Sequence, residues 1–307
     1  MEKKLPVFRL EESKIYLTDE ASDMTIKEPR DTEYFKGLEV KEDLYESNFD
    51  ITAVQRVECP DLGQDVILKK IFKENLISKR QLHQARIEFA LQSALKHPNI
   101  VQCFDYGECE DVVYGTLEAC NKPTYLTETI DEDLMQIESE IQLKAFMADI
   151  LEGMDYFHSL GIIHFDIKLE NILAHFDEGS ILPTLKICDF GLAHVLDEKG
   201  KVFIKEKLGT MHYIAPEVKK NTEITQKVDI WSLGICLYKM SCAYRPNQVK
   251  NYTYGSGDIP FRRIDWKKRS PELIDLVKSM LQYKPEDRIT VKEALDHPWF
   301  HVDGEII

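Results

Sequence analysis

The chain has 307 residues, of which 43% are hydrophobic and 30% are charged. A chain of this size and composition can bury one large core or two modest ones, which excludes a peptide, a disordered tail and a fibre. Its 39 basic and 54 acidic side chains give a formal net charge of −15. Nucleic acid is therefore not expected as a partner, because binding to phosphates without sequence preference needs a clustered positive surface.

Membrane insertion and export are not expected either. No apolar run approaches the roughly 18 residues of a spanning helix, and the first residues, Met1 to Lys4, lack the apolar stretch of a secretory signal. The seven cysteines are scattered and form no Cys-x-x-Cys pair, so they are expected to be reduced thiols. We expect a cytoplasmic protein, and the sequence leaves its oligomeric state open.

Three stretches follow one another along the chain. Residues 1–46 contain 8 basic and 13 acidic side chains and no sustained apolar period, which predicts an acidic arm. Residues 47–120 contain β-branched runs that predict strands at 51–57, 66–72 and 112–117, with one helix at 79–95. Residues 121–300 are predicted to be mainly helical, with amphipathic segments at 143–157 and 273–281 and a last helix from 291, and 301–307 form a short tail.

Polar residues that suggest chemistry are concentrated in the helical stretch. Asp166, Lys168 and Asn171 stand between apolar residues in one short segment. Several further motifs follow in chain order: Asp189-Phe190-Gly191, Gly209-Thr210, Ala215-Pro216-Glu217, Asp229-Ile230-Trp231 and Arg288. In type, order and spacing these motifs, over about residues 49–300, resemble the eukaryotic protein kinases. The serine/threonine branch is indicated, with a similarity to calmodulin-dependent kinases in Lys168 and in His297-Pro298-Trp299-Phe300.

The resemblance implies an α+β fold, bilobal, with a small β-rich N-lobe at 47–120 and a larger helical C-lobe at 121–300. It implies transfer of the γ-phosphate of ATP, with Mg²⁺, to a hydroxyl of a protein substrate. Asp166 would be the catalytic base, Lys168 would steady the γ-phosphate, and Thr210 would contact both. Asn171 and Asp189 would hold the metal.

The N-lobe half of the site is expected on the second strand. A period of two places Ile67, Lys69 and Ile71 on one face, and the strand resembles the V-A-I-K strand of the family, whose lysine clamps the phosphates. Glu88 in the following helix is the expected partner of Lys69, the alternative being that both are exposed surface charges. The resemblance assigns the remaining nucleotide contacts to Val54, Ile67, Glu118, Cys120 and Leu173.

Two further residues are expected to have structural roles. The resemblance implies an ion pair between Glu217 and Arg288, and it implies that Asp229 anchors the catalytic loop from a buried helix.

The chain departs from the family where the nucleotide phosphates would be covered. The three phosphate-loop glycines would fall at Ser47, Phe49 and Thr52, so the close backbone approach that glycine allows is missing. Ile67 replaces a small residue that roofs the adenine pocket, and overfilling a packed site costs ~1–3 kcal/mol. Weak nucleotide binding is therefore expected.

Other departures concern regulation and alignment. Phe165 replaces the arginine that would bind a phosphorylated activation loop, and Glu206 stands at the position of the primary phosphosite. Gln92 replaces an apolar residue, so its amide would need a partner.

Two functions stay open at this point. The retained charged residues favour an active serine/threonine kinase, whereas the lost glycines and Ile67 favour a pseudokinase that acts as a scaffold or allosteric binding partner. Glu170 could meet a basic residue of a substrate, but Lys239 and Thr124 stand where basophilic relatives carry acids.

Overall fold

The computed structural model describes residues 7–11, 14–18, 38–46, 51–130, 137, 139–205, 207–219, 221–248 and 259–301. Within the chain two compact units are distinguished, Met1–Ala119 and Cys120–Ile307, and each is considered by itself.

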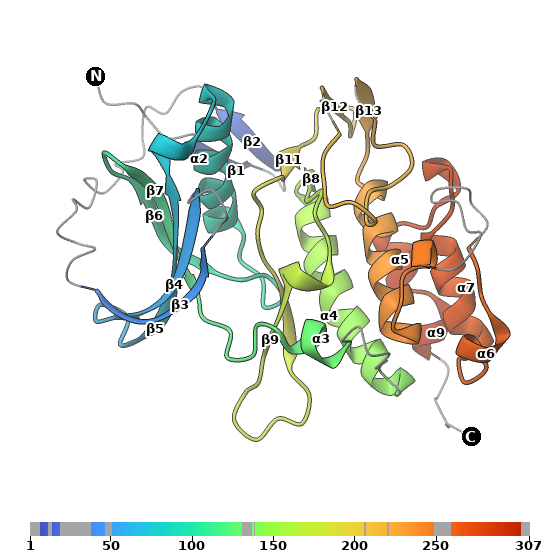
Figure 1. Cartoon of the computed structure of the whole chain (residues 1–307). Coiled ribbons are helices and arrows are strands. Elements are labelled where there is room, and N and C mark those ends of the chain that lie inside the picture. Colours follow the sequence, from blue (N-terminus) through green and yellow to red (C-terminus); the bar gives the residue numbers. More distant parts are fainter. Residues whose placement is uncertain are drawn as a thin grey trace. The chain divides into compact units, whose positions relative to one another are not determined.

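The N-terminal unit contains a five-stranded antiparallel sheet (Figure 1). Its strand order is β3-β4-β5-β7-β6, and the strands span Glu39–Glu46 (β3), Thr52–Cys59 (β4), Gln64–Phe72 (β5), Cys103–Glu108 (β6) and Val112–Glu118 (β7). A separate antiparallel pair precedes the sheet, formed by β1 (Val7–Glu11) and β2 (Lys14–Thr18). The strands predicted at 51–57, 66–72 and 112–117 correspond to β4, β5 and β7.

Strand β3 corrects the expectation that residues 1–46 form an arm outside the sheet. It pairs with β4, with Tyr45 opposite Val54, so the sheet begins before residue 47. The described side chains of β3 are all exposed, which explains why its sequence shows no apolar alternation. Strand β6 was not expected from the sequence either.

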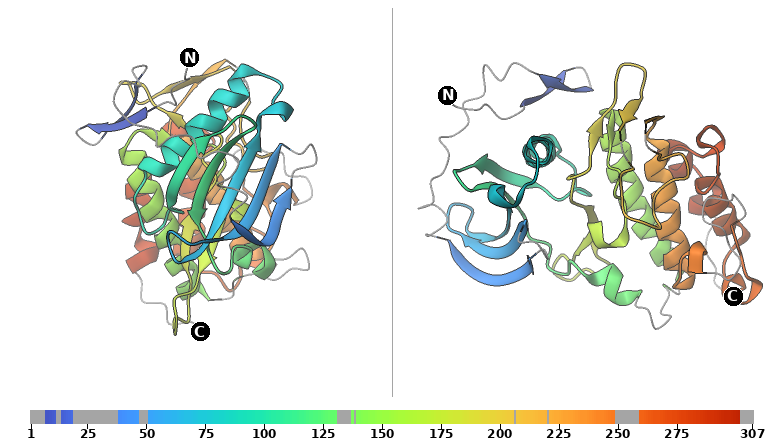
Figure 2. Two further views of the ribbon diagram at one scale, coloured as in Figure 1. Left: turned by 90° about the vertical axis from the view of Figure 1, so that its left-hand side faces the viewer. Right: turned by 45° about the horizontal axis from the view of Figure 1, so that its top comes forward.

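Helix α2 (Lys79–Ala94) packs against β6 and β7, and a 3₁₀ turn, η1 (Lys73–Asn75), lies between β5 and this helix (Figure 2). The helix begins where the Ser78 side chain accepts a hydrogen bond from the Gln81 amide at 3.2 Å, a common N-cap. Gly115 on β7 permits the close approach of the helix, because a Cβ atom there would lie 2.3 Å from the Phe89 ring. The helix predicted at 79–95 is thus confirmed to within one residue.

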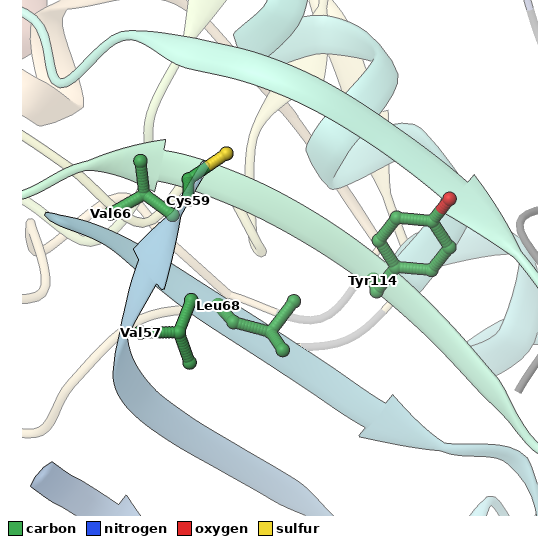
Figure 3. Packing of buried hydrophobic residues seen from close by; sticks show 5 residues of the cluster. All are labelled: Val57, Cys59, Val66, Leu68 and Tyr114. Carbon is green, nitrogen blue, oxygen red and sulfur yellow. The ribbon is translucent and has the colours of Figure 1, made fainter. Parts of the chain in front are cut away.

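Two buried clusters hold the N-terminal unit together. One cluster consists of Val57, Cys59, Val66, Leu68 and Tyr114 (Figure 3). The other joins α2 to the sheet through Ile71, Ala85, Phe89 and Val113. Alternate residues of β5 therefore enter different clusters, as the period of two requires.

The C-terminal unit is mainly helical. Its helices are α3 (Tyr125–Thr129), α4 (Glu140–Ser159), α5 (Lys227–Cys242), α6 (Arg263–Trp266), α7 (Pro271–Met280), α8 (Val291–Leu295) and α9 (Pro298–His301), with 3₁₀ turns η2 (Leu169–Asn171), η3 (Pro246–Gln248) and η4 (Pro285–Asp287). Three short antiparallel pairs accompany them: β8 (Ile162–Ile163) with β11 (His194–Val195), β9 (Ile172–His175) with β10 (Thr184–Ile187), and β12 (Val202–Ile204) with β13 (Thr222–Ile224).

Helix α5 is the centre of this unit (Figure 1). It packs against α4, α6 and α7, and almost all of its residues are buried, including Trp231 with 0% exposure. A buried helix is a rigid support, because its side chains interdigitate with their neighbours at high packing density. The polar residue Asp229 near its start is therefore held at a fixed place. Within the described ranges, the helices lack the combination of length and apolar content that crossing a bilayer requires.

Candidate active site

The carboxylate of Asp166 is the centre of a hydrogen-bond network in the C-terminal unit. Its Oδ1 atom accepts hydrogen bonds from the Thr210 amide at 3.0 Å and from the Thr210 hydroxyl at 2.6 Å. Its Oδ2 atom accepts from the Lys168 ammonium at 2.7 Å and from the Asn171 amide nitrogen at 3.2 Å. Only 7% of Asp166 is exposed, so these partners, rather than water, compensate much of the cost of burying its charge.

Thr210 joins the two charged side chains of this network. Its hydroxyl donates to Asp166 and accepts from the Lys168 ammonium at 2.9 Å. The preceding residue, Gly209, has φ +101°, and a Cβ atom there would lie 2.7 Å from the Phe165 carbonyl oxygen. Glycine is thus required next to Thr210, because a side chain would strain the backbone and push this segment away from the catalytic loop.

The Asn171 side chain is oriented by hydrogen bonds to Asp166. Its amide nitrogen donates to the Asp166 backbone carbonyl at 2.9 Å as well as to the Asp166 carboxylate, and two acceptors there fix which end of the amide is nitrogen. The Oδ1 atom is consequently left for another ligand. An amide oxygen and the Asp189 carboxylate are the hard oxygen donors that Mg²⁺ prefers, so the donor set fits this metal.

Asp229 fixes the catalytic loop from α5. Its two carboxylate oxygens accept hydrogen bonds from the backbone amides of His164 and Phe165, both at 2.9 Å. The His158 imidazole lies 2.9 Å from the same carboxylate, and Asp229 has 0% exposure. The anchoring role expected for Asp229 therefore has a direct geometric basis.

Phe165 stands directly before Asp166 and is buried. Its backbone has φ +66°, a left-handed conformation that non-glycine residues seldom adopt. Its ring meets the His194 ring edge to face, with centroids 5.3 Å apart. The position that would bind a phosphate in the family is here occupied by an aromatic contact between the catalytic loop and β11.

Asp189 and Phe190 follow strand β10 in the C-terminal unit. Asp189 also has a positive φ, of 65°. Phe190 is fully buried, and its ring centroid lies 4.7 Å from that of His164 and 5.8 Å from that of Phe157. The aromatic packing fixes the turn from which the Asp189 carboxylate projects.

Lys69 and Glu88 come together in the N-terminal unit. The lysine ammonium on β5 donates to the glutamate carboxylate on α2 at 2.6 Å. Both side chains are largely buried, with exposed fractions of 16% and 6%. The alternative of two exposed surface charges is therefore excluded.

The other residues expected to contact nucleotide are divided between the units. In the N-terminal unit, Val54 lies opposite Lys69 and Ile67 lies opposite Leu117 in the sheet, and Glu118 ends β7. The Glu118 carboxylate accepts a hydrogen bond from the Gln102 amide at 3.2 Å. In the C-terminal unit, Cys120 is buried, and Leu173 is half-buried on β9 opposite Lys186.

Glu217 and Arg288 form the ion pair that the resemblance implied. Arg288 donates to Glu217 from two nitrogens, at 2.7 and 3.1 Å, and has only 1% exposure. Such two-point pairing fixes both position and orientation.

Comparison with known proteins identifies the family to which most of the chain is similar. Residues 51–300 match the family described as the protein kinase domain. The chain belongs to the protein kinase family. Its fold class is accordingly the bilobal α+β protein-kinase fold, as the motifs predicted.

Similar proteins are serine/threonine kinases by name. The chain is 36% identical over 254 residues to serine/threonine-protein kinase cds1 of Schizosaccharomyces pombe, covering 78% of this chain and 53% of that protein. It is 34% identical over 250 residues to calcium-dependent protein kinase 17 of Arabidopsis thaliana, covering 79% and 46%. It is 31% identical over 256 residues to probable serine/threonine-protein kinase fhkB of Dictyostelium discoideum, covering 78% and 21%. The chain thus spans between about a fifth and a half of the length of these relatives.

The Gln92 side-chain amide, which was expected to need a partner, forms a hydrogen bond. Its side-chain nitrogen donates to the Val101 backbone carbonyl at 2.9 Å, and 1% of the residue is exposed. The amide nitrogen that this polar residue introduces on α2 therefore has an acceptor.

Three positions at which the sequence departs from the family have no structural description. Ser47, Phe49 and Glu206 lie outside the described residues, so the predictions for the phosphate loop and the phosphosite concern positions without a structural description. Thr52 is half-buried at the start of β4, opposite Ile71.

Sequence reasoning missed Arg245 and Tyr213 of this kinase. The Arg245 guanidinium lies 5.8 Å from the centroid of the Tyr213 ring, although the two residues are far apart in the sequence. No motif joins them, and the only available signal was that both are close in sequence to helix α5 or to Thr210.

Proposed function

We propose that this chain is a serine/threonine protein kinase that transfers the γ-phosphate of ATP to a hydroxyl of a protein substrate. The observation that carries the proposal is the arrangement of Asp166, Lys168 and Thr210, a carboxylate held between an ammonium and a hydroxyl. The family match and the names of the relatives support it. ATP and Mg²⁺ are the proposed cofactors.

Asp166 is the proposed base. Both of its oxygens are held by short hydrogen bonds, so the carboxylate has one orientation in which to accept the proton of a substrate hydroxyl. Lys168 uses two of its three ammonium protons on Asp166 and Thr210. The third proton is available for an oxygen of the transferred phosphoryl group, where charge develops.

Lys69 is proposed to bind phosphate oxygens of the nucleotide, held in place by Glu88. Asn171 and Asp189 are proposed to bind Mg²⁺. When bound, this metal neutralises charge on the phosphates of ATP and so favours transfer of the γ-phosphate. Removal of the lysine or of the metal ligands is thus expected to weaken productive nucleotide binding, not only the chemical step.

The experiment that tests the proposal compares wild type with Asp166→Asn. Transfer of labelled phosphate to a mixed serine and threonine peptide array is measured, together with the ATP-induced rise in melting temperature, with and without Mg²⁺. We expect transfer to fall ~10²–10⁴-fold, since a positioned base contributes about that much. Nucleotide binding should persist, because ligand binding to the folded form raises stability by RT ln(1 + [L]/Kd).

Asp177→Asn is the matched control, because its side chain is 75% exposed, and it should leave both measurements unchanged. An unchanged transfer rate in Asp166→Asn would overturn the role of Asp166. Absence of transfer by wild type with either Mg²⁺ or Mn²⁺ would favour the pseudokinase instead, a scaffold or allosteric partner of another protein. Cytoplasmic location stays a prediction, which imaging of the tagged full chain would test.

A further inference from the structure

Two cations of the C-terminal unit have no ion-pair partner among the described residues. Lys239 is on the last turns of α5, and Arg245 follows that helix; both are half-buried. Among the residues that the structure describes, neither side chain forms an ion pair. Half-buried charges without a partner are costly, since they lose part of their hydration and gain no opposite charge.

Arg245 is held in a defined position. Its backbone amide donates to the Gln248 side chain at 2.7 Å, and its guanidinium lies over the Tyr213 ring. The Arg245 Nε atom is buried without a hydrogen-bond partner in the described part of the chain. The Arg245 side chain interacts with the buried Tyr213 hydroxyl, which keeps its own proton to donate. Tyr213 itself is only 2% exposed. A guanidinium and a hydroxyl of this kind are suited to donate to an anion that arrives from outside.

The Cys236 thiol on α5 is influenced by the charges of both cations and by charges of the catalytic loop. Burial raises the pKa of this thiol on α5, and the charges of Glu170 and Asp166 raise it further, while those of Lys239 and Arg245 lower it. One fully buried atom thus senses both cations and the proposed base. Hydrogen bonds place Arg245 in the same neighbourhood: its guanidinium lies over the Tyr213 ring, and the Tyr213 amide donates to the Thr210 carbonyl at 3.1 Å. The Thr210 hydroxyl in turn donates to the Asp166 carboxylate, so this cation stands near the residues that would meet a bound target hydroxyl.

Glu170 is the opposing charge in this neighbourhood. It is exposed and has no ion-pair partner among the described residues, so water compensates its charge. Lys239 and Arg245 are less hydrated and outnumber it. The charge that gains most from a partner is therefore positive, which favours an anionic group on the substrate.

We infer that Lys239 and Arg245, with the Tyr213 hydroxyl, form a subsite that selects substrates carrying an anionic side chain near the phosphorylated hydroxyl. The inference rests on the proposed kinase function and adds the substrate class to it. The anion is either a carboxylate of Asp or Glu or the phosphate of a residue phosphorylated beforehand. Both present oxygen acceptors to guanidinium and ammonium donors.

The test is a set of serine-centred peptides in which one position at a time is Asp, phosphoserine, Ala or Arg. We expect wild type to prefer an anion over Ala at one defined position by about tenfold in kcat/KM, the effect of roughly 1.4 kcal/mol. Preference for phosphoserine over Asp at that position would identify a phosphorylated substrate as the source, and equal preference would identify simple acidity. Raising the salt concentration should reduce the preference.

Charge reversal supplies the decisive comparison. Lys239→Glu and Arg245→Glu should abolish the anion preference and increase the rate with the Arg peptide. Lys239→Gln and Arg245→Gln remove the charge with less disturbance and should abolish the preference without the gain. Lys284→Glu, at an exposed position of the same unit, makes the same change in net charge and should leave the preference intact.

Failure of this inference and failure of the proposed function give different results. Transfer by wild type that favours Arg, or an anion preference that survives both charge reversals, would overturn the subsite while the kinase function stands. If no peptide is phosphorylated, the same fluorescently labelled peptides are titrated by anisotropy. Tighter binding of the anionic peptides, lost in the charge-reversed variants, would support the subsite without turnover, and equal binding of all peptides would refute it.

Discussion

Two regions differ in how many of the family's functional residues they retain. One is the catalytic loop of the C-terminal unit, and the other is formed by strands β4 and β5 of the N-terminal unit. In the loop, Asp166 accepts four hydrogen bonds from three side chains and one backbone amide, and Asp229 supports the loop from a buried helix. In the strands, the Lys69–Glu88 pair is present, but Ile67 occupies the same face as Lys69, and no glycine stands where the family places its phosphate loop.

The difference separates two tasks of a kinase. Proton acceptance and charge neutralisation need particular polar groups at fixed distances, and the loop supplies them. A close backbone cover over the phosphates needs residues without side chains, and the sequence has no glycine at the corresponding positions. The contrast therefore predicts a protein whose chemical step is well supported and whose hold on the nucleotide is weak.

Breaking the support of the loop should have the largest effect. Asp229→Ala leaves the buried amides of His164 and Phe165 without an acceptor. Each orphaned buried donor costs ~1–3 kcal/mol, so we expect the free energy of unfolding to fall by ~3–5 kcal/mol. Urea denaturation measures this loss.

The matched control for Asp229 is an exposed aspartate. Asp177→Ala should change stability by less than ~0.5 kcal/mol, as is usual for surface positions. If the two variants were equally stable, the loop would not depend on α5 for its position.

Sequence and structure agree best where a pattern is local. The bounds of α2 follow from Ser78 and the apolar spacing, and the pairing of Lys69 with Glu88 follows from a strand period and a helix count. Strand β3 could not be predicted in this way, because as an edge strand with exposed side chains it carries no alternation. Pairing with β4 forms it, and pairing is a non-local property.

The candidate site shows the same limit. Spacing to family motifs gave Asp166, Lys168, Asn171 and Thr210, which the structure brings together. Arg245 and Tyr213 meet only because the chain turns after α5, where Ala243 adopts a left-handed conformation with φ 67°. A contact made by tertiary packing leaves no periodic signal in the sequence.

The second prediction concerns the N-terminal unit, where binding of the nucleotide is expected to be weak. Ile67→Ala should tighten ATP binding by up to ~3 kcal/mol if the side chain, which lies on the Lys69 face, overfills the adenine position as the sequence predicts. The ATP-dependent shift in melting temperature, referred to each variant's own melting temperature without ATP, measures the change.

Val66→Ala supplies the comparison for Ile67, since its side chain has 0% exposure and enters the cluster with Leu68 and Tyr114. That variant should lose stability through a cavity and gain no affinity. Weaker or unchanged ATP binding by Ile67→Ala would show that the isoleucine does not limit the nucleotide pocket.

The third prediction concerns the hydroxyl that joins Asp166 to Lys168. Thr210→Val keeps the shape and removes two hydrogen bonds at 2.6 and 2.9 Å, so both charged groups lose a positioning contact. We expect kcat to fall ~10²-fold, with KM for ATP changed much less, because small displacements of catalytic groups cost about that much.

Thr210→Ser retains the hydroxyl and should restore most of the rate. A rate loss of equal size in Thr210→Ser and Thr210→Val would assign the effect to packing of the methyl group. Steady-state kinetics with the best peptide of the array distinguishes these results.

The smallest effect is expected from dephosphorylation. A phosphate on the activation segment needs charge-assisted donors to order it, and the ring of Phe165 supplies none. The segment has other attachments: β12 pairs with β13, and Lys201 forms an ion pair with Glu223 at 2.8 Å. Phosphatase treatment should therefore change kcat by less than about twofold, well under the ~10²-fold attributed to Thr210.

Mass spectrometry establishes the phosphate content before and after treatment. A large loss of rate that maps to a phosphosite between Asp189 and Glu217 would refute the prediction, because it would require a basic partner for the phosphate other than residue 165. The variant Glu206→Gln separates a built-in charge from an added one: if only this variant loses activity, a fixed carboxylate, and not a phosphate, orders the segment.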